Sequence, residues 1–301
     1  MSEPIQHIVP PIVTRFAPSP TGRLHIGHGW SALMAMDLAR AGGGALRLRI
    51  EDIDGARSRA EHVAGIIADL RWLGVEWDGD AVFQSARLAQ YDAALERLRV
   101  DGLVYPCFCT RAEIAAEIAA SGSAPQGDGG EAAVYPGTCR ALSESERAAR
   151  IAAGAAHCWR LDMGQAVARA GPLTWQDMAR GLIVARPEDA GDVVLARKDA
   201  PTSYHLAATV DDATMGITHV LRGNDLMPAT DIHRLLQALL GLPTPLYRHH
   251  PLLGDASGRR LAKRSGSVSL AELREQGTEP YKLREDMRAG RFPVGIRILN
   301  A

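Results

Sequence analysis

Two histidines three residues apart, His25 and His28, stand where a short β-rich run passes into an alanine-rich helical pattern. Side chains three apart share one face of a helix, and a helix N-terminus offers free N–H groups and partial positive charge to a phosphate. Gly27 between them would let a nucleotide approach the backbone. With the turn-forming run at 18–22 before them, they predict a nucleotide phosphate site, whereas either histidine alone would be an ordinary residue of a helix start.

A second candidate for phosphate chemistry lies much later in the chain. Four cations fall among the six residues 259–264, between Gly258 and Ser265. Such a basic loop could close over a polyphosphate and neutralise the charge that develops as pyrophosphate leaves. Without the histidine pair, an exposed basic turn would be the simpler interpretation.

Three of the four cysteines, Cys107, Cys109 and Cys139, lie within 33 residues of one another. In a chain without a secretory signal, clustered cysteines indicate a metal before a disulfide framework. Three thiolates suit Zn²⁺, which takes four ligands at a structural site. The Cys-x-Cys spacing is less diagnostic than Cys-x-x-Cys, so three buried free thiols remain the alternative. Cys158 lies in an apolar strand pattern and is expected in the core.

Alternating strand and helix patterns must position these residues. β-rich runs at 12–16 and 46–50 flank the helical pattern that follows the histidines and ends at glycines 42–44. A strand, a turn, a helix and a strand form a βαβ unit and favour a parallel sheet. Ligands of such sheets lie beyond the carboxyl ends of the strands. Further helices are expected at 57–73, 88–99 and 231–240.

The composition is that of an ordinary globular protein, with 46% hydrophobic and 23% charged residues among 301. No run approaches the roughly 20 apolar residues that cross a bilayer, so we expect a cytoplasmic protein with no membrane partner. Residues 222–301 carry 13 Lys and Arg against 8 Asp and Glu, and residues 1–221 carry 21 against 27. The basic C-terminal part is compatible with a phosphate-rich partner, although uneven surface charge alone would explain it.

Both the histidine and the basic segments resemble signatures of class I aminoacyl-tRNA synthetases, in the form that glutamate enzymes use. RFAPSPTG at 15–22, followed by HIGH at 25–28, is similar to the first signature. RLAKR at 260–264 is similar to the second, the KMSKS loop, with Ala262 in place of the Ser. Arg replaces the first Lys and keeps its charge, so we expect activity to survive. The resemblance implies that ATP is bound by His25, Gly27, His28, Arg260 and Lys263.

An enzyme that binds glutamate needs partners for one ammonium and two carboxylates. An arginine beside a hydroxyl donor suits the side-chain carboxylate, and a carboxylate suits the ammonium. Whether Arg15 or Arg222 binds the γ-carboxylate stays open, and alone Glu51 would be a surface acid and Tyr204 a core aromatic. By resemblance, the glutamate-binding positions are Arg15, Phe16, Ala17, Pro18, Ser19, Glu51, Tyr204 and Arg222.

The resemblance also implies a mechanism in which the α-carboxylate of glutamate attacks the α-phosphorus of ATP and gives glutamyl-adenylate and pyrophosphate. No protein nucleophile is required. His25, His28 and Lys263 are the expected catalytic residues, through positioning and charge stabilisation. Mg²⁺ is expected to accompany ATP.

The implied fold is α/β, a Rossmann-like (HUP-type) parallel sheet with an inserted zinc-bearing, acceptor-type module. The expected ranges are 12–104 for the first half of the catalytic domain, 105–194 for the module, 195–256 for the second half, and 257–301 for the signature loop and a short stem-contact-like tail. Tyr135 resembles the tyrosine zinc ligand of short glutamyl synthetase homologues, which implies the ligand set Cys107, Cys109, Tyr135 and Cys139 for one structural Zn²⁺.

Only 37 residues follow Arg264, too few for the anticodon-binding domain that a full glutamyl-tRNA synthetase carries there. A catalytic domain with a zinc-bearing insert and no anticodon-binding domain resembles the glutamyl-queuosine tRNA(Asp) synthetases. That family activates L-glutamate without tRNA and attaches it to the queuosine base at the wobble position of tRNA(Asp). The implied partner is the anticodon stem-loop, whose splayed bases and phosphates suit basic and aromatic surfaces.

Three alternatives remain open at this point. The chain could be a truncated glutamyl-tRNA synthetase that acts on tRNA(Glu), or a nucleotidyltransferase that forms the adenylate of a small acid and binds no tRNA. It could also be a non-catalytic RNA-binding relative. The presence of His25, His28, Glu51 and Lys263 argues against the last of these.

Overall fold

The βαβ unit predicted near the N-terminus is present in the computed structural model, which describes residues 11–55, 57–120, 134–261 and 268–299. Strand β1 (Val13–Phe16) runs parallel to β2 (Ala45–Ile50), and helix α1 (Ile26–Ala41) connects them. Strand β3 (Val82–Phe83) adds to the far side of β2, also parallel. The parallel sheet expected from the sequence is therefore confirmed.

The glycines after α1 allow a close approach of the backbone to the start of β1. A Cβ built on Gly44 would lie 1.9 Å from the carbonyl oxygen of Ile12, so no other residue fits there without moving the chain. The next residue, Ala45, donates its N–H to that oxygen at 3.0 Å. The turn thus sets the register in which β2 begins beside β1.

The predicted helices that follow are also present. Helix α2 (Ala60–Trp72) lies within the predicted range 57–73, and α3 (Leu88–Val100) matches 88–99 to one residue. In the second half, α7 (Tyr204–Thr214) and α8 (Met227–Leu240) pack on each other in a second apolar cluster that also contains side chains of α3. Short 3₁₀ helices connect elements at Gln84–Arg87, Thr138–Ala141, Pro187–Ala190 and Asn224–Leu226.

A second sheet stands beside the first. Strands β9 (His219–Gly223) and β10 (Leu246–His250) are parallel, β6 (Thr174–Asp177) pairs parallel with β10, and β7 (Gly181–Val184) forms a hairpin with β6. The backbone N–H of Thr218, just before β9, donates to the Val13 carbonyl at 2.9 Å. This contact brings β9 alongside β1, so the carboxyl ends of strands from both halves open toward one region.

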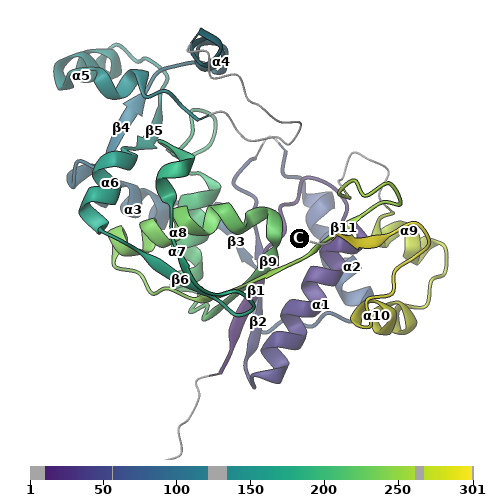
Figure 1. The fold of residues 1–301 in the computed structure, drawn as a ribbon. Coiled ribbons are helices and arrows are strands. Elements are labelled where there is room, and N and C mark those ends of the chain that lie inside the picture. Colours follow the sequence, from purple (N-terminus) through teal and green to yellow (C-terminus); the bar gives the residue numbers. More distant parts are fainter. Residues whose placement is uncertain (1–10, 56, 121–133, 262–267, 300–301) are drawn as a thin grey trace, which may run out of the picture.

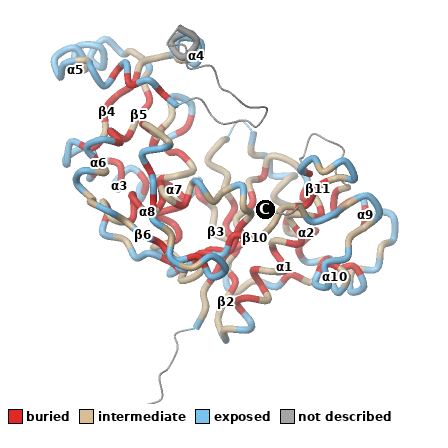
Figure 2. The backbone as a smooth tube through the Cα atoms, viewed as in Figure 1, coloured by how far each residue is buried: buried red, intermediate tan, exposed pale blue. Residues whose placement is uncertain are grey.

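The segment between the two halves contributes to two different sheets. Its β4 (Val104–Cys107), β5 (Cys158–Leu161) and β8 (Val194–Ala196) form an antiparallel sheet, whereas β6 and β7 join β10. The remaining helices here are α4 (Arg111–Ala120), α5 (Glu144–Ala152) and α6 (Met163–Ala170). Figure 1 shows β4, β5, α4 and α5 extending away from α1, and Figure 2 shows that α5 is exposed along its length.

The C-terminal part packs against the N-terminal half. Strand β11 (Leu252–Gly254) pairs antiparallel with β12 (Arg297–Leu299), and helices α9 (Leu270–Glu275) and α10 (Pro280–Arg288) contribute leucines to the core around α1. Arg288 of α10 binds the Asp37 carboxylate of α1 through two nitrogens, at 2.6 and 2.9 Å. No helix within the described ranges is long and apolar enough to cross a bilayer.

Buried charges connect α7 to the first sheet. The Arg49 side chain of β2, with no exposed surface, donates to Asp212 at 2.6 Å, and Arg15 of β1 donates to the same oxygen at 3.0 Å. The neighbouring Asp211 accepts from Gln84 at 2.8 Å and from the Tyr91 hydroxyl at 2.8 Å. Because isolated charges are costly to bury, these groups stay buried only in the arrangement that pairs them.

We expect Asp211→Asn to lower the free energy of unfolding by about 3–5 kcal/mol. The buried network loses one of its carboxylates, and the new amide NH₂ group meets side chains that are themselves hydrogen-bond donors. Chemical denaturation measures the change. Glu96→Gln on the exposed face of α3 is the control and should stay within about 0.5 kcal/mol of the wild type. Equal stability of both variants would contradict the role assigned to Asp211.

Candidate active site

A cavity of about 610 Å³ opens beyond the carboxyl ends of β1, β2 and β9, at the edge where the sequence predicts a ligand site. Residues of both halves line it, so the cavity exists only when the two sheets stand side by side. The structure brings together twelve predicted site residues in its lining: Arg15, Phe16, Ala17, Pro18, Ser19, His25, Gly27, His28, Glu51, Tyr204, Arg222 and Arg260. Lys263, the remaining predicted residue for ATP, lies outside the described residues.

The two histidines form the start of α1. His25 is the N-cap residue, and its Nδ1 accepts the Gly27 N–H at 3.1 Å. The His25 N–H in turn donates to Nδ1 of His28 at 3.1 Å, and the two ring centres lie 3.7 Å apart. Because each Nδ1 accepts a hydrogen, Nε2 is the nitrogen that carries one. The pair therefore presents N–H donors at a helix N-terminus, which suits a phosphate.

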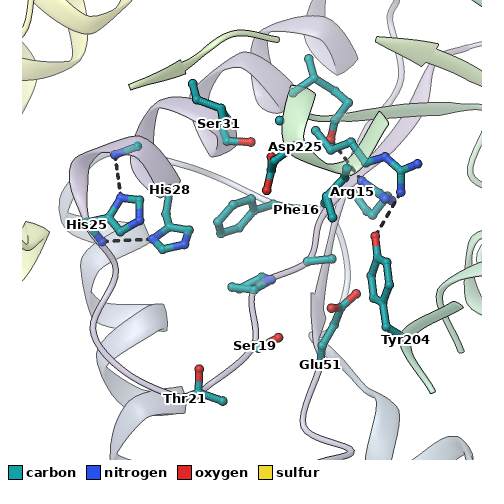
Figure 3. Close-up of a pocket in the computed structure, with 18 of the residues that line it drawn as sticks. Arg15, Phe16, Ser19, Thr21, His25, His28, Ser31, Glu51, Tyr204 and Asp225 are labelled. Carbon is teal, nitrogen blue, oxygen red and sulfur yellow. Dashed lines mark hydrogen bonds between the residues drawn. The ribbon is translucent and has the colours of Figure 1, made fainter. Parts of the chain in front are cut away.

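Gly27 also has a structural role at the start of α1. A Cβ at this position would lie 3.0 Å from Cε1 of His25 and 3.1 Å from its Nδ1. The missing side chain thus allows the His25 ring to fold back over the first turn of α1. Figure 3 shows both rings at one side of the cavity, with Ser19 and Thr21 of the preceding turn below them.

The opposite side of the cavity carries Glu51, Arg15 and Tyr204 (Figure 3), and Arg222 also lines the cavity. Glu51 follows β2 and accepts from Arg49 at 3.1 Å. Burial raises the pKa of its carboxyl group, against the opposing effect of Arg49. Arg222 of β9 donates to the Tyr204 hydroxyl at 3.0 Å, and burial raises the pKa of that hydroxyl. The hydroxyl and the guanidinium thus form one polar surface toward the cavity.

The two candidate arginines differ in their charge partners. Arg15 forms an ion pair with Asp212 at 3.0 Å and donates to the Leu221 carbonyl at 3.2 Å. Within the described chain, the side-chain hydrogen bonds of Arg222 all go to uncharged groups, on Tyr204, Thr230, His233 and His249. Arg222 is only 4% exposed. A buried cation without an anion favours an anionic ligand beside it.

Sequence reasoning missed several polar residues of the lining, among them Asp225 and His250. Asp225, three residues after Arg222, accepts from Arg260 at 2.6 Å and so connects the start of the basic loop to the end of β9. Nε2 of His250 at the end of β10 lies 3.0 Å from the Ser31 hydroxyl of α1. Both residues stand at carboxyl ends of strands, and that position is the signal that could have found them.

The cysteine cluster forms a separate site at the outer end of the β4–β5–β8 sheet. The thiol sulfurs of Cys107, Cys109 and Cys139 lie within 4.8 Å of one another. The Tyr135 hydroxyl lies 3.4 Å from the Cys107 sulfur and 3.5 Å from that of Cys109, and it accepts the Cys139 N–H at 2.9 Å. Three sulfurs and one oxygen therefore converge on one point.

This donor set fits a tetrahedral metal ion. Ligand sulfurs at about 2.3 Å from Zn²⁺ stand about 3.8 Å apart, and the sulfurs of Cys109 and Cys139 are 3.3 Å apart. Hydrogen bonds from Cys158, Tyr135 and Arg160 lower the pKa of the Cys107 thiol, although burial opposes this. A readily formed thiolate is the form that binds metal. A metal site at the three cysteines, expected from the sequence, is consistent with this geometry.

Comparisons with known proteins identify the family of this chain. The family model for the catalytic domain of class I tRNA synthetases (E and Q) matches residues 11–295. A glutamyl-Q tRNA(Asp) synthetase of Rhodobacter capsulatus is 48% identical over 280 residues, which cover 91% of this chain and 98% of that protein. A glutamate–tRNA ligase of a Methylobacterium species is 42% identical over 89% of this chain and 58% of its own length.

The fold also matches a solved structure. A glutamate tRNA ligase from Elizabethkingia meningosepticum, crystallised in complex with its amino acid, superposes with a TM-score of 0.71 at 29% identity. The match covers 85% of this chain and 53% of that one, so the chain spans about half the length of the ligase. The chain belongs to the class I tRNA synthetases for glutamate and glutamine, and within them to the glutamyl-Q tRNA(Asp) synthetases.

Proposed function

We propose that this protein activates L-glutamate with ATP to glutamyl-adenylate without tRNA, and transfers the glutamate to the queuosine base at the wobble position of tRNA(Asp). The reaction takes place in the cytoplasm, with Mg²⁺ accompanying ATP. The observation that carries the choice of amino acid is the buried, uncompensated Arg222 at the same cavity as the histidine pair.

Glutamate binding follows from the charges of the lining. Arg222 and the Tyr204 hydroxyl, 3.0 Å apart, together bind the γ-carboxylate. Glu51 accepts the ammonium group, and Arg15, already paired with Asp212, positions the residues 16–19 that surround the α-carboxylate. An amide in place of the γ-carboxylate would leave Arg222 buried without an anion, which disfavours glutamine.

Adenylation uses the other side of the cavity. The Nε2–H groups of His25 and His28 donate to the phosphates of ATP, and Arg260 and Lys263 stabilise the charge that develops on departing pyrophosphate. Arg260 stands near the site because Asp225 binds it at 2.6 Å. Attack by the α-carboxylate needs no protein nucleophile, so these residues act by position and charge.

The acceptor is proposed from the relatives. The Rhodobacter capsulatus protein, which this chain covers almost completely, is named for transfer to tRNA(Asp) through queuosine. A glutamate–tRNA ligase that charges tRNA(Glu) is the second candidate, since such ligases match at 42% identity over about half of their length. A nucleotidyltransferase that binds no tRNA has no support from these relatives.

The cysteine site is proposed to hold one structural Zn²⁺, bound by Cys107, Cys109, Tyr135 and Cys139. All four protein ligands together would fill a tetrahedron and leave no open position for chemistry. The ion would tie β4 to the 3₁₀ turn Thr138–Ala141, across residues 121–133. Its role is then to order this end of the molecule.

Glutamate-dependent exchange of labelled pyrophosphate into ATP should occur without any tRNA. Arg222→Gln should lower kcat/KM for glutamate by about 100-fold or more, because a charged hydrogen-bonded pair to the substrate is lost. Arg248→Gln, on the exposed face of the neighbouring strand β10, is the matched control and should exchange like the wild type. Folded wild-type protein that shows no exchange would remove the activation proposal.

Labelled glutamate should transfer to tRNA(Asp) that contains queuosine. The same tRNA with guanosine at the wobble position should stay unlabelled, because the acceptor group belongs to the modified base. Acid-gel separation of the labelled tRNA measures the transfer. Labelling of tRNA(Glu) instead would favour the second candidate function.

Elemental analysis should find about one Zn per chain. Cys109→Ala should lose most of this zinc and lower the melting temperature, because three ligands hold the ion more weakly than four. Cys158→Ala, which removes a hydrogen bond to Cys107 but none of the four proposed ligands, should keep most of the zinc. Equal zinc content in both variants would contradict the proposed ligand set.

A further inference from the structure

Arg222 is held by a set of neutral acceptors that meet it from three sides. The His249 ring of β10 stands opposite it in the register of the parallel strands, with Nε2 at 3.3 Å from Nε of Arg222. The Thr230 hydroxyl of α8 accepts from Nη2 at 2.7 Å, and Nδ1 of His233 lies 3.4 Å from Nη1. A carboxylate in any of these places would bind Arg222 more strongly and would also neutralise it.

The tautomer of His249 follows from its neighbours. A guanidinium has only donors, so Nε2 of His249 must present its lone pair to Arg222 and Nδ1 must carry the hydrogen. That hydrogen is donated to Asp177 Oδ2 at 2.8 Å. Burial, together with the charge of Arg222, lowers the pKa of His249 to about 4, against the effect of Asp177. The ring therefore faces Arg222 as a neutral acceptor at physiological pH.

Asp177 is itself fixed in orientation. It ends β6 and has no exposed surface. Its Oδ1 accepts the backbone N–H groups of Ala179 at 2.9 Å and Arg180 at 3.1 Å, which leaves Oδ2 for His249. Although burial acts in the opposite direction, the hydrogen bond from His249 and those from the backbone keep the pKa of Asp177 below its ordinary value. The His249 ring thus lies between the negative charge of Asp177 and the Arg222 guanidinium.

We propose that Asp177 and His249 are positioning residues for the amino-acid site: Asp177 fixes the tautomer of His249, and His249 orients Arg222 without neutralising it. The inference rests on the proposed binding of the glutamate γ-carboxylate by Arg222. It assigns a purpose to two buried groups that do not line the cavity. Because the Asp177 carboxylate acts through the imidazole ring, it orders the arginine without forming an ion pair with it, and the guanidinium can still bind the substrate carboxylate.

Asp177→Asn tests this assignment because the backbone dictates how the new amide lies. Two backbone N–H groups, of Ala179 and Arg180, need its oxygen on one side, against the single and longer contact from the His249 N–H at 3.3 Å on the other, so its NH₂ group faces Nδ1 of His249. His249 then carries its hydrogen on Nε2, where the Thr230 hydroxyl at 3.1 Å can accept it, but Arg222 loses the acceptor that stood 3.3 Å from its Nε. We expect the dissociation constant and the KM for L-glutamate to rise about tenfold or more, with the KM for ATP unchanged.

Two further variants separate positioning from general damage. His249→Gln can donate its amide NH₂ to Asp177 and accept from Arg222 with its oxygen, so glutamate binding should stay within about threefold of the wild type. Asp231→Asn makes the same chemical change at a partly buried carboxylate, which accepts from Trp175 at 2.7 Å and is not among the hydrogen-bond partners of Arg222 in the described chain. It should leave both KM values unchanged.

Calorimetric titration with L-glutamate alone, exchange kinetics and melting temperatures are measured on all four proteins. The proposal is overturned when folded Asp177→Asn protein binds glutamate like the wild type. It is equally overturned when Asp177→Asn and Asp231→Asn weaken glutamate and ATP alike in step with their melting temperatures. A wild type that neither binds L-glutamate nor supports exchange removes the proposed function itself, and the positioning role with it.

Discussion

The pairing of Arg15 and Arg49 with two adjacent aspartates of α7 is the constraint on which the site depends. These charges are buried, so each must meet its partner or the protein would carry the cost of an isolated ion. Asp211 and Asp212 lie two turns after Tyr204, the first residue of the same helix. Fixing the aspartates against β1 and β2 therefore also fixes where the Tyr204 hydroxyl stands in the cavity.

The same pairing gives two similar arginines different chemistry. Arg15 and Arg222 end neighbouring strands and both reach the cavity. Asp212 neutralises the first, at 3.0 Å, whereas uncharged acceptors surround the second. A buried cation that has no protein anion binds a ligand carboxylate with little competition from its surroundings. The proposed selectivity for an acidic side chain rests on Arg222 having no carboxylate among its hydrogen-bond partners in the described part of the chain, as much as on the arginine itself.

The end of the molecule that holds the cysteine cluster is connected to the rest through a second buried acid. Asp192 accepts from the Tyr105 hydroxyl of β4 and from Arg140, the residue after Cys139, at 3.2 Å. It also accepts the Met163 N–H at 3.0 Å at the start of α6. Arg160, whose guanidinium lies 3.9 Å from the centre of the Tyr135 ring, donates to the Asp192 carbonyl at 2.7 Å. Outer contacts of this kind orient the groups that bind a metal.

The sequence alone determined the elements with a local pattern. The β-rich runs at 12–16 and 46–50, the helix after His25 and the cysteine cluster follow from periodicity, turn residues and spacing, and the structure confirms the parallel unit and the converging thiols. The sequence did not predict that β6 and β7 join β10, because nothing in these short strands specifies a partner about 70 residues away. The C-terminal helices α9 and α10 were not predicted either, since their many exposed polar residues hide the pattern of the few leucines that they bury.

Only the tertiary structure decided which arginine is paired with a carboxylate of the protein. Arg49 meets Asp212 across 163 residues and Arg15 meets it across 197, and no local signal marks these pairs. The sequence shows that arginines, acids and hydroxyls end several strands, and this suffices to name the site. Whether a given arginine is neutralised depends on distances of a few ångströms between distant segments, and only the packed fold sets those distances.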